Sequence, residues 1–377
     1  MVMISTKTLY NAVLKTEQIY DTHKFQSLPQ PSGSYPYRLN LDVPADSKKL
    51  IFQMVGDTGG LNTAGARQQV VKQMAAQYTN AATKHDEPSF LYHLGDIVYH
   101  YGEAEQYEGQ FLGPFEYYPG PIYAIAGNHD SDINPESETH YDSLEAFYTT
   151  FCNTCPKTIY FGQHIQRKSQ VQPNVYWTMQ TPLATIIGLY TNVPKYGCIK
   201  KDQKNWFIKE LQHAAKYSTD KAIILCLHHA PYSADLNHGS SLVMIDFLET
   251  AFATAGVKPD VVFSGYVHNY QRFSKQYSDG KTVPFIVAGA GGFEDLHSLA
   301  NPNDPAYDTK SSALDQVQLE NYCDNKQGFL KIEIEKNPFN FSIKGSYYTI
   351  PDLDKDSPEE LQQASLFDSF RIDLTGR

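Results

Sequence analysis

The sequence predicts a layered α/β fold with two packed sheets, and three observations support this prediction. The chain has 377 residues, of which 41% are hydrophobic, which is ample apolar material for a large core. From residue 49 onward, short apolar runs rich in Ile, Val, Leu and aromatic residues alternate with helical segments. Several later runs follow one another without intervening helices, and a second sheet packed on the first would account for them.

Five of the expected strands run directly into a short polar block. The strands are Leu50–Val55, Phe90–Leu94, Ile122–Ala126, Ala222–Leu227 and Val261–Ser264. The blocks that follow them are, in order, Gly56-Asp57, Gly95-Asp96, Gly127-Asn128-His129-Asp130, His228-His229 and Gly265-Tyr266-Val267-His268. A glycine before Asp57, Asp96 and Asn128 allows a sharp turn at the end of each strand.

Helices are expected between these strands. The segment from Thr63 to Ala82 has apolar spacing near the helical period, and Ser241–Ala255 is amphipathic and closes at Gly256. Asp202 is expected to cap the N-terminus of a third helix. The later strands are expected at Tyr176–Met179, Ala184–Tyr190, Phe285–Ala288, Phe329–Ile334 and Phe341–Tyr347.

The chain is expected to divide into three parts. Residues 1–48 form a proline-punctuated lead-in segment, residues 49–350 form the main domain that carries the polar blocks, and residues 351–377 form an acidic C-terminal tail. Within the tail, Leu366–Leu374 is a candidate last element. A single C-x-x-C, Cys152 to Cys155, favours free thiols, with a local disulfide as the alternative.

Charge and hydropathy limit the partners. The net charge of −11 counts against a general nucleic-acid binder, but metal ions can reverse the local potential for a small phosphorylated substrate. No stretch approaches the roughly 18 to 20 apolar residues of a membrane span, so no membrane partner is expected. The first ten residues lack a signal-peptide pattern, which favours a cytoplasmic location, or a periplasmic or secreted one if the N-terminus has been trimmed. The oligomeric state is left open.

The five polar blocks are expected to converge, because open α/β sheets collect their ligand sites at the carboxyl ends of strands. Carboxylate oxygen, amide oxygen and imidazole nitrogen are ligands for Zn, Mn and Fe. Each block alone could have a purely structural role, since Gly-Asp is a common turn and single histidines are often loop or core residues. Their occurrence in order, each after a strand, favours a two-metal site that binds phosphate.

The blocks resemble the motifs of the calcineurin-like metallophosphoesterases. The matching motifs are Gly56-Asp57-Thr58-Gly59, Gly95-Asp96-x-x-Tyr99, Gly127-Asn128-His129-Asp130, His228 and Gly265-x-x-His268-x-Tyr270-x-Arg272. The tyrosine of the second motif indicates the purple acid phosphatase branch. The resemblance runs from about Lys49 to Gly292 and implies a four-layer α/β/β/α sandwich, with two mixed β-sheets flanked by helices.

The resemblance also implies two metal ions. One, which is Fe(III) in this branch, would be bound by Asp57, Asp96, Tyr99 and His268. The other, which is Zn, Mn or Fe(II), would be bound by Asp96, Asn128 and His228. His229 is the alternative to His228, and only one of the pair is expected to be a ligand, because neighbouring residues leaving a strand point in opposite directions.

One position departs from the family pattern. The last motif is usually G-H-x-H, but this chain has Tyr266 in the place of the first histidine, which normally completes the second metal's ligands. Tyr266 would ligate as a phenolate, leave a position filled by water, or mark a weakened second site. One bound metal instead of two therefore stays an open alternative.

The resemblance assigns the remaining chemistry. His129 would stabilise charge on the phosphoryl group, with Asp130 orienting it, and His238 would be the general acid for the leaving alkoxide. The expected activity is hydrolysis of phosphate monoesters by a metal-bridging hydroxide, with an acid optimum. The alternatives are a phosphodiesterase or nucleotide pyrophosphatase on the same site, and a degenerate phosphate-binding protein whose second metal site is incomplete.

Overall fold

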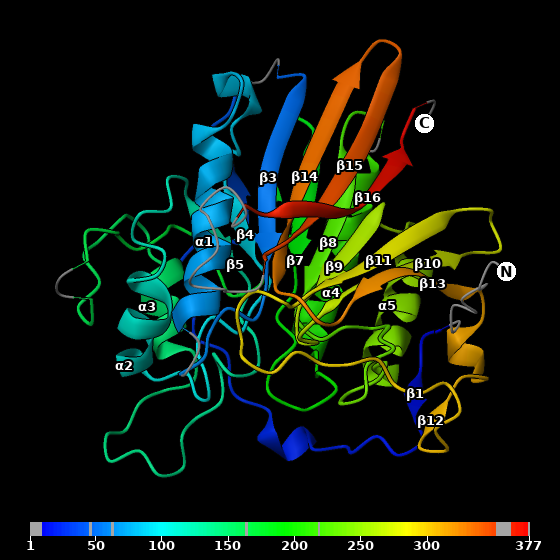
Figure 1. Ribbon diagram of the computed structural model, residues 1–377, viewed down its shortest axis with the longest axis horizontal. Coiled ribbons are helices and arrows are strands. Elements are labelled where there is room, and N and C mark those ends of the chain that lie inside the picture. Colours follow the sequence, from blue (N-terminus) through cyan, green and yellow to red (C-terminus); the bar gives the residue numbers. More distant parts are fainter. Residues whose placement is uncertain are drawn as a thin grey trace, which may run out of the picture.

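Two β-sheets lie face to face in the computed structural model, with helices on their outer sides (Figure 1). The model describes residues 10–44, 47–61, 64–162, 165–217, 219–351 and 363–375. The six-stranded sheet has the order β16-β15-β14-β3-β4-β5, and the eight-stranded sheet has the order β13-β10-β11-β9-β8-β7-β6-β2. A separate pair joins β1 to β12. The four-layer α/β/β/α sandwich is therefore confirmed.

The strands agree closely with the expected runs. The six-stranded sheet contains β3 (Lys49–Val55), β4 (Leu91–His93), β5 (Ile122–Ala124), β14 (Gly328–Asn337), β15 (Asn340–Thr349) and β16 (Ser365–Asp373). The eight-stranded sheet contains β2 (Arg38–Asn40), β6 (Trp177–Gln180), β7 (Ala184–Gly188), β8 (Ala222–Leu227), β9 (Val261–Ser264), β10 (Tyr270–Gln276), β11 (Thr282–Ala288) and β13 (Val317–Cys323). The small pair consists of β1 (Leu14–Lys15) and β12 (Tyr307–Asp308).

Both sheets are mixed. β3, β4 and β5 are parallel, as are β7, β8, β9 and β11, whereas β14 and β15 pair antiparallel beside β3. The helices are α1 (Ala64–Thr79), α2 (Ala104–Tyr107), α3 (Glu145–Phe151), α4 (Lys201–Ala215) and α5 (Leu242–Ala255), with short turns at Thr22–Lys24, Lys84–Asp86 and Ser312–Leu314.

Strand β8 shows how the layers are stabilised. Its residues 222, 224 and 226 join the core between the two sheets, while residues 223, 225 and 227 join the outer core, to which α4 and α5 also contribute. Successive side chains of a strand point to opposite faces, so a strand that is apolar throughout must be covered on both faces. The continuous apolar run Ala222–Leu227 is therefore the sequence signature of a strand in the middle of this sandwich.

The expected start of one helix needs correction. Helix α4 begins at Lys201, and Lys200 rather than Asp202 is the N-cap. Asp202 lies in the first turn, where a carboxylate also interacts favourably with the helix dipole. The segment 102–119 contains α2 and a π-helical turn at Glu108–Leu112. Helix α5 is as expected, with Ser241 as N-cap and Gly256 in the left-handed conformation at its end.

The five cysteines are free thiols, so the alternative of a Cys152–Cys155 disulfide is wrong. Both flanking segments contribute strands to the sandwich: β2 pairs with β6, and β16, expected as a last element, pairs with β15. The expected acidic stretch at 352–362 lies outside the described residues. In the part of the chain that the structure describes, no helix has the length and apolar character needed to cross a membrane.

Candidate metal centre

The five polar blocks meet at one edge of the sandwich, where β3, β4, β5, β8 and β9 end. Asp57 and Asp96 both have positive φ angles, of 59° and 53°, so each strand ends in a sharp turn. Glycine is required beside them, because a Cβ on Gly127 would lie 2.0 Å from Asp96 Oδ1, and one on Gly95 would lie 2.7 Å from His228 Nδ1. The glycines expected from the sequence thus allow the loops to approach closely.

The first group of ligand candidates is Asp57, Tyr99 and His268. The Tyr99 hydroxyl lies 3.2 Å from Asp57 Oδ1 and 3.0 Å from His268 Nε2, and His268 Nε2 lies 3.6 Å from the same carboxylate oxygen. Asp57 and Tyr99 are buried and His268 is nearly so. Three oxygen and nitrogen donors therefore face a common point.

The second group is Asp96, Asn128 and His228. His228 Nε2 lies 3.3 Å from Asp96 Oδ2 and 3.1 Å from Asn128 Oδ1. One ligand atom from each of Asp57, Asp96 and His228 falls within 4.8 Å of the others, so the two groups adjoin. Asp96 lies between the groups, as a bridging carboxylate must.

Backbone carbonyls orient both histidines. His228 Nδ1 lies 2.8 Å from the carbonyl oxygen of Leu94, and His268 Nδ1 lies 3.0 Å from that of Asp295. A carbonyl can only accept, so each Nδ1 carries a proton and each Nε2 is the ring nitrogen that faces a carboxylate. This is the usual arrangement of a metal-binding histidine.

His229 faces the other way from His228. Its Nδ1 bonds to the Thr191 hydroxyl at 2.7 Å, and its ring packs against Tyr266 with centroids 4.3 Å apart. Its Nε2 is buried, and no described residue offers it a hydrogen bond. The contacts favour His228 over His229 as the ligand, as the alternation along the strand predicts.

Burial of these charged groups costs free energy unless a counter-ion is bound. Burial raises the pKa of Asp57 well above its usual value, and the nearby Asp96 carboxylate raises it further. Burial disfavours ionisation of Asp96 too, but His228 and His129 hold its pKa below the usual range. Although burial opposes it, Asp96 raises the pKa of His228 to about 9. A bound cation would compensate both carboxylates, so the residues present fit a metal site.

Tyr266 does not point its hydroxyl at the carboxylates. The hydroxyl donates to the carbonyl oxygen of Lys195, while the backbone N–H of Tyr266 donates to both Asp57 oxygens, at 3.1 and 3.0 Å. Burial, followed by the charge of Asp96, raises the pKa of the phenol well above its usual value. Of the three possibilities raised by the sequence, these contacts argue against a phenolate ligand and favour a second group that lacks one protein ligand.

Asp130 is positioned differently from the sequence expectation. Its carboxylate accepts hydrogen bonds from the backbone N–H groups of Ile97, Val98 and Gly127, at 2.8 to 3.2 Å. His129 instead bonds through Nδ1 to the carbonyl oxygen of His100, at 2.7 Å. Asp130 therefore joins the second and third loops, and the expectation that it orients His129 is wrong. His129 still lines the cavity over the cluster.

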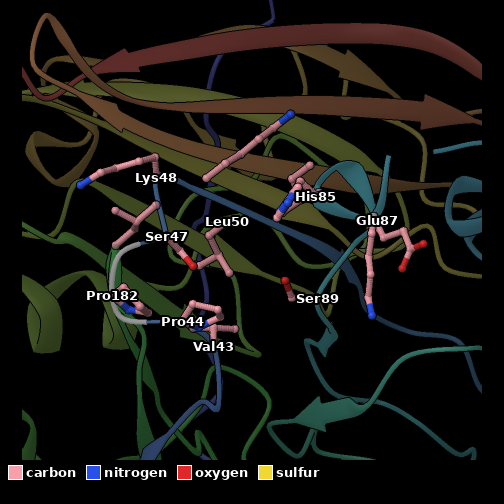
Figure 2. A pocket seen from close by; sticks show the side chains of 13 residues that line it. Val43, Pro44, Ser47, Lys48, Leu50, His85, Glu87, Ser89 and Pro182 are labelled. Atoms are coloured by element: carbon pink, nitrogen blue, oxygen red, sulfur yellow. The ribbon is translucent and has the colours of Figure 1, made fainter. Parts of the chain in front are cut away.

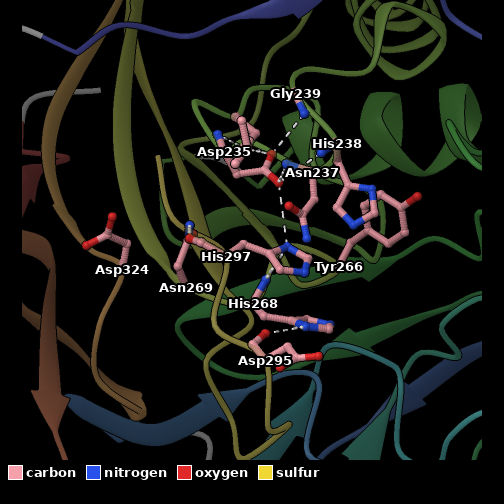
Figure 3. Close-up of polar contacts among 12 residues, drawn as sticks. Asp235, Asn237, His238, Gly239, Tyr266, His268, Asn269, Asp295, His297 and Asp324 are labelled. Atoms are coloured by element: carbon pink, nitrogen blue, oxygen red, sulfur yellow. Dashed lines mark hydrogen bonds and ion pairs between the residues drawn. The ribbon is translucent and has the colours of Figure 1, made fainter. Parts of the chain in front are cut away.

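A second cluster, Asp235, His238 and His297, lies beside the first (Figure 3). The Asp235 carboxylate accepts from the Ser233 hydroxyl and from the backbone N–H groups of residues 237, 238 and 239, and His297 Nδ1 lies 3.5 Å away. Those bonds occupy the carboxylate, so Asp235 organises the loop that carries His238. The His238 ring lies against Tyr266, with centroids 4.2 Å apart.

The site opens into a cavity of about 630 Å³. Its lining combines the metal-ligand candidates with residues from distant segments, namely Ile19, Asp21, His23, Lys24, Asp96, Tyr99, His100, Asn128, His129, Asp132, Val193, Lys195, Asn237, His238, Tyr266, His268, Phe293 and His297. A second cavity, of about 530 Å³, lies at the opposite end of β3 between Lys48, His85 and Glu87 (Figure 2). Neither cluster of metal-type ligands found among the described residues reaches that second cavity.

Sequence reasoning missed His297, Lys195 and the contribution of the N-terminal segment. His297 follows the glycine-rich stretch that ends at Gly292, and its ring stacks on His268 with centroids 4.2 Å apart. Lys195 lies in a loop without a motif, and the lead-in had no periodic signal. Tyr270 and Arg272, to which no chemistry was assigned, both bond to Asp368 on β16 and join strands.

Carboxylate, amide, phenol and imidazole groups that meet at this edge of a four-layer sandwich are the groups expected of a metal-dependent phosphoesterase. Residues 54–270 match the model of the calcineurin-like phosphoesterase family, and the chain belongs to that family. Family membership implies a dinuclear metal centre, for which Asp57, Asp96 and His228 form a candidate ligand group.

Among known proteins, the chain is similar to purple acid phosphatases. Purple acid phosphatase 22 of Arabidopsis thaliana is 29% identical over 210 residues, which are 53% of this chain and 43% of that protein. Purple acid phosphatase 18 of the same plant is 30% identical over 128 residues, which are 32% of this chain and 27% of that protein. The chain thus spans less than half the length of these relatives.

The chain also shares its fold with solved structures, one of which is GAP50, described as the anchor in the inner membrane complex of Plasmodium, with a TM-score of 0.55 and 13% sequence identity. The match covers 87% of this chain and 89% of that one. At this identity the likeness concerns the fold alone.

Proposed function

We propose that the protein hydrolyses small phosphate monoesters with two bound metal ions. The observation that carries this proposal is the pair of buried carboxylates, Asp57 and Asp96, faced by the Nε2 atoms of His268 and His228. Tyr99 and Asn128 supply one further oxygen to each group. The similarity to purple acid phosphatases supports Fe(III) beside Tyr99, since a phenolate is a hard anionic ligand, and Zn, Mn or Fe(II) beside Asn128.

When bound, such ions would neutralise phosphate oxygens and acidify a water that becomes the nucleophile. The chain's own residues would do the rest. Asp57, Asp96, Asn128, Tyr99 and the two histidines would hold the ions. His129, which lines the cavity, would donate a hydrogen bond to the phosphoryl group as its charge grows.

His238 would protonate the leaving alkoxide. Its ring lies in the same cavity, and its Nδ1 is buried without a hydrogen-bond partner among the described residues. Burial, opposed by Asp235, lowers its pKa to about 4. A proton held by so acidic a group is readily transferred to an alkoxide, but the group carries that proton only in acid.

A second candidate is a degenerate phosphate-binding protein, and the contacts of Tyr266 are the observation that favours it. If the second group of ligands is too weak to hold an ion, phosphate would bind without efficient turnover. A phosphodiesterase or nucleotide pyrophosphatase on the same residues is the third candidate.

Turnover measurements on metal-loaded protein separate these candidates. The purified chain would be stripped with a chelator, reloaded with Fe, Zn or Mn, and assayed with p-nitrophenyl phosphate and bis-p-nitrophenyl phosphate from acid to neutral pH. Preferential release from the monoester that depends on metal supports the proposal. Release mainly from the diester favours the third candidate. Phosphate binding without turnover of either substrate under any metal would refute the enzymatic proposal.

A further inference from the structure

The N-terminal segment is fixed across the metal-binding edge of the sandwich. In Figure 1 it runs along the lower side of the molecule and carries β1, which pairs with β12. The Gln18 side chain bonds to the backbone at both Ser240 and Leu242, and the Gln26 backbone exchanges two hydrogen bonds with the Asn192 side chain. These contacts hold the segment in one place before any ligand binds.

Asp21 ties the segment to the loop that carries Lys195. Its carboxylate accepts from the Lys195 backbone N–H, at 3.0 Å from Oδ1 and 3.2 Å from Oδ2. The same loop accepts the Tyr266 hydroxyl at the Lys195 carbonyl, so it adjoins the metal centre. Asp21, Lys24 and Lys195 all line the cavity over the cluster.

The lysines at this wall outnumber their acidic partners. The Lys24 ammonium lies 3.8 Å from Asp21, and that carboxylate is already bonded to the backbone. No described carboxylate lies within ion-pair distance of the Lys195 ammonium. Burial, then repulsion from Lys15, lowers the pKa of Lys195, although the charges of Asp21 and Asp235 oppose that shift. Two lysines that line one cavity, with Asp21 as the one described carboxylate within ion-pair distance of either, form a place for an anion.

We infer that Lys24 and Lys195 form a second anion subsite, so that the preferred substrates are phosphate esters whose alcohol part carries a second anionic group, phosphoryl or carboxylate. This inference rests on the proposed function, because the scissile phosphate is taken to lie at the metal centre. The second group would lie at the opposite wall of the same cavity, next to the N-terminal segment. A phosphate ester with a neutral alcohol would leave the Lys195 ammonium without an anionic partner and Lys24 with Asp21 alone.

A matched substrate series tests the subsite. Propyl phosphate, 3-phosphooxypropanoate and propane-1,3-diol bisphosphate differ only in the far group, and kcat/KM is measured for each by phosphate release. The expected order is bisphosphate above carboxylate above propyl, with about tenfold or more between the first and last, since each charge-assisted hydrogen bond contributes that much. Comparison of the bisphosphate with the carboxylate shows which of the two anionic groups the subsite prefers. Equal kcat/KM for all three substrates would overturn the inference.

The variant Lys24→Gln/Lys195→Gln is expected to bring the ratio of bisphosphate to propyl phosphate close to one. Lys201→Gln/Lys344→Gln removes two charges from exposed positions on α4 and β15 and is the matched control, expected to keep the wild-type ratio. A ratio that survives in the first variant contradicts the assignment to these lysines.

Binding measured by calorimetry separates failure of the subsite from failure of the proposed function. Propane-1,3-bisphosphonate is expected to bind the metal-loaded protein at least about tenfold more tightly than propylphosphonate, and the lysine variant should lose that difference. If no ester is hydrolysed but the difference is present, the proposed hydrolysis fails and the subsite stands. If propyl phosphate is hydrolysed but no difference is found, the subsite fails and the hydrolysis stands.

Discussion

The two halves of the metal centre lie at the same edge of the sandwich but differ in what surrounds them. Around Asp57, the Tyr99 hydroxyl and the His268 ring both face the carboxylate. Around Asp96, Asn128 and His228 are the described side chains that face the corresponding space, and the Tyr266 hydroxyl is bonded instead to the Lys195 carbonyl. The backbone N–H of Tyr266 still donates to Asp57 in the first half. The same residue therefore stabilises the first half but supplies no ligand to the second.

This difference shows that a motif position can keep the backbone contact of the motif while its side chain makes different contacts. Tyr266 has a positive φ of 70°, and its N–H donates to Asp57 as the turn requires. Its side chain packs between His229 and His238, with ring centroids 4.3 and 4.2 Å away. Variants at Asp96, His238 and Tyr266 test this difference between the halves.

The largest effect is expected at the carboxylate shared by both halves. Asp96→Asn removes the charge that faces His228 and is expected to lower turnover by about a thousandfold or more, since bridging two ions requires a carboxylate. Metal content measured by mass spectrometry should fall for both ions. Asp132→Asn, at a residue that also lines the cavity but whose carboxylate accepts from the neighbouring Ile133 N–H, should keep its metals. Undiminished activity in Asp96→Asn would contradict the shared role.

The next effect concerns the general acid. Because the pKa of His238 is lowered to about 4, its ring carries a proton below that pH and loses it as the pH rises. Turnover of an alkyl phosphate is therefore expected to fall as the pH rises through about 4. His238→Ala should lower the acid-side rate by about a hundredfold and flatten that dependence. A pH–rate profile of the same shape in wild type and variant would exclude His238 as the proton donor.

The smallest effect separates the halves most cleanly. Tyr266→His supplies the missing imidazole and is expected to raise affinity for the second ion by about tenfold or more, within the range by which metal sites respond to a changed partner. Tyr266→Phe removes only the hydroxyl. It should leave metal affinity unchanged and lower the free energy of unfolding by about 1 kcal/mol, the usual contribution of one hydrogen bond. Equal metal affinities in all three proteins would show that position 266 does not limit the second half.

Much of the fold was predictable because each buried strand is a local pattern that ends in a polar turn. The run Ala222–Leu227 and the pair after it indicate both a central strand and the candidate ligand His228. The convergence of the five blocks followed from the rule that parallel strands end at one edge.

The remaining features depend on contacts between residues far apart in the sequence. Tyr266 bonds to a carbonyl 71 residues away, and Asp21 bonds to an amide 174 residues away. No periodicity links such positions, so the role of the N-terminal segment was not visible in the sequence. Asp130 was misassigned because the motif places it next to His129, whereas its carboxylate turns back to three backbone N–H groups.

A calorimetric titration of chelator-stripped protein with Zn²⁺ or Mn²⁺ tests the inequality of the two halves most directly. Two binding events are expected, with the second weaker by about tenfold or more, because the Asp96–Asn128–His228 group lacks one protein ligand. Turnover of p-nitrophenyl phosphate should rise with the second event and not with the first. Two ions bound with equal affinity, or full turnover with one ion bound, would contradict the account.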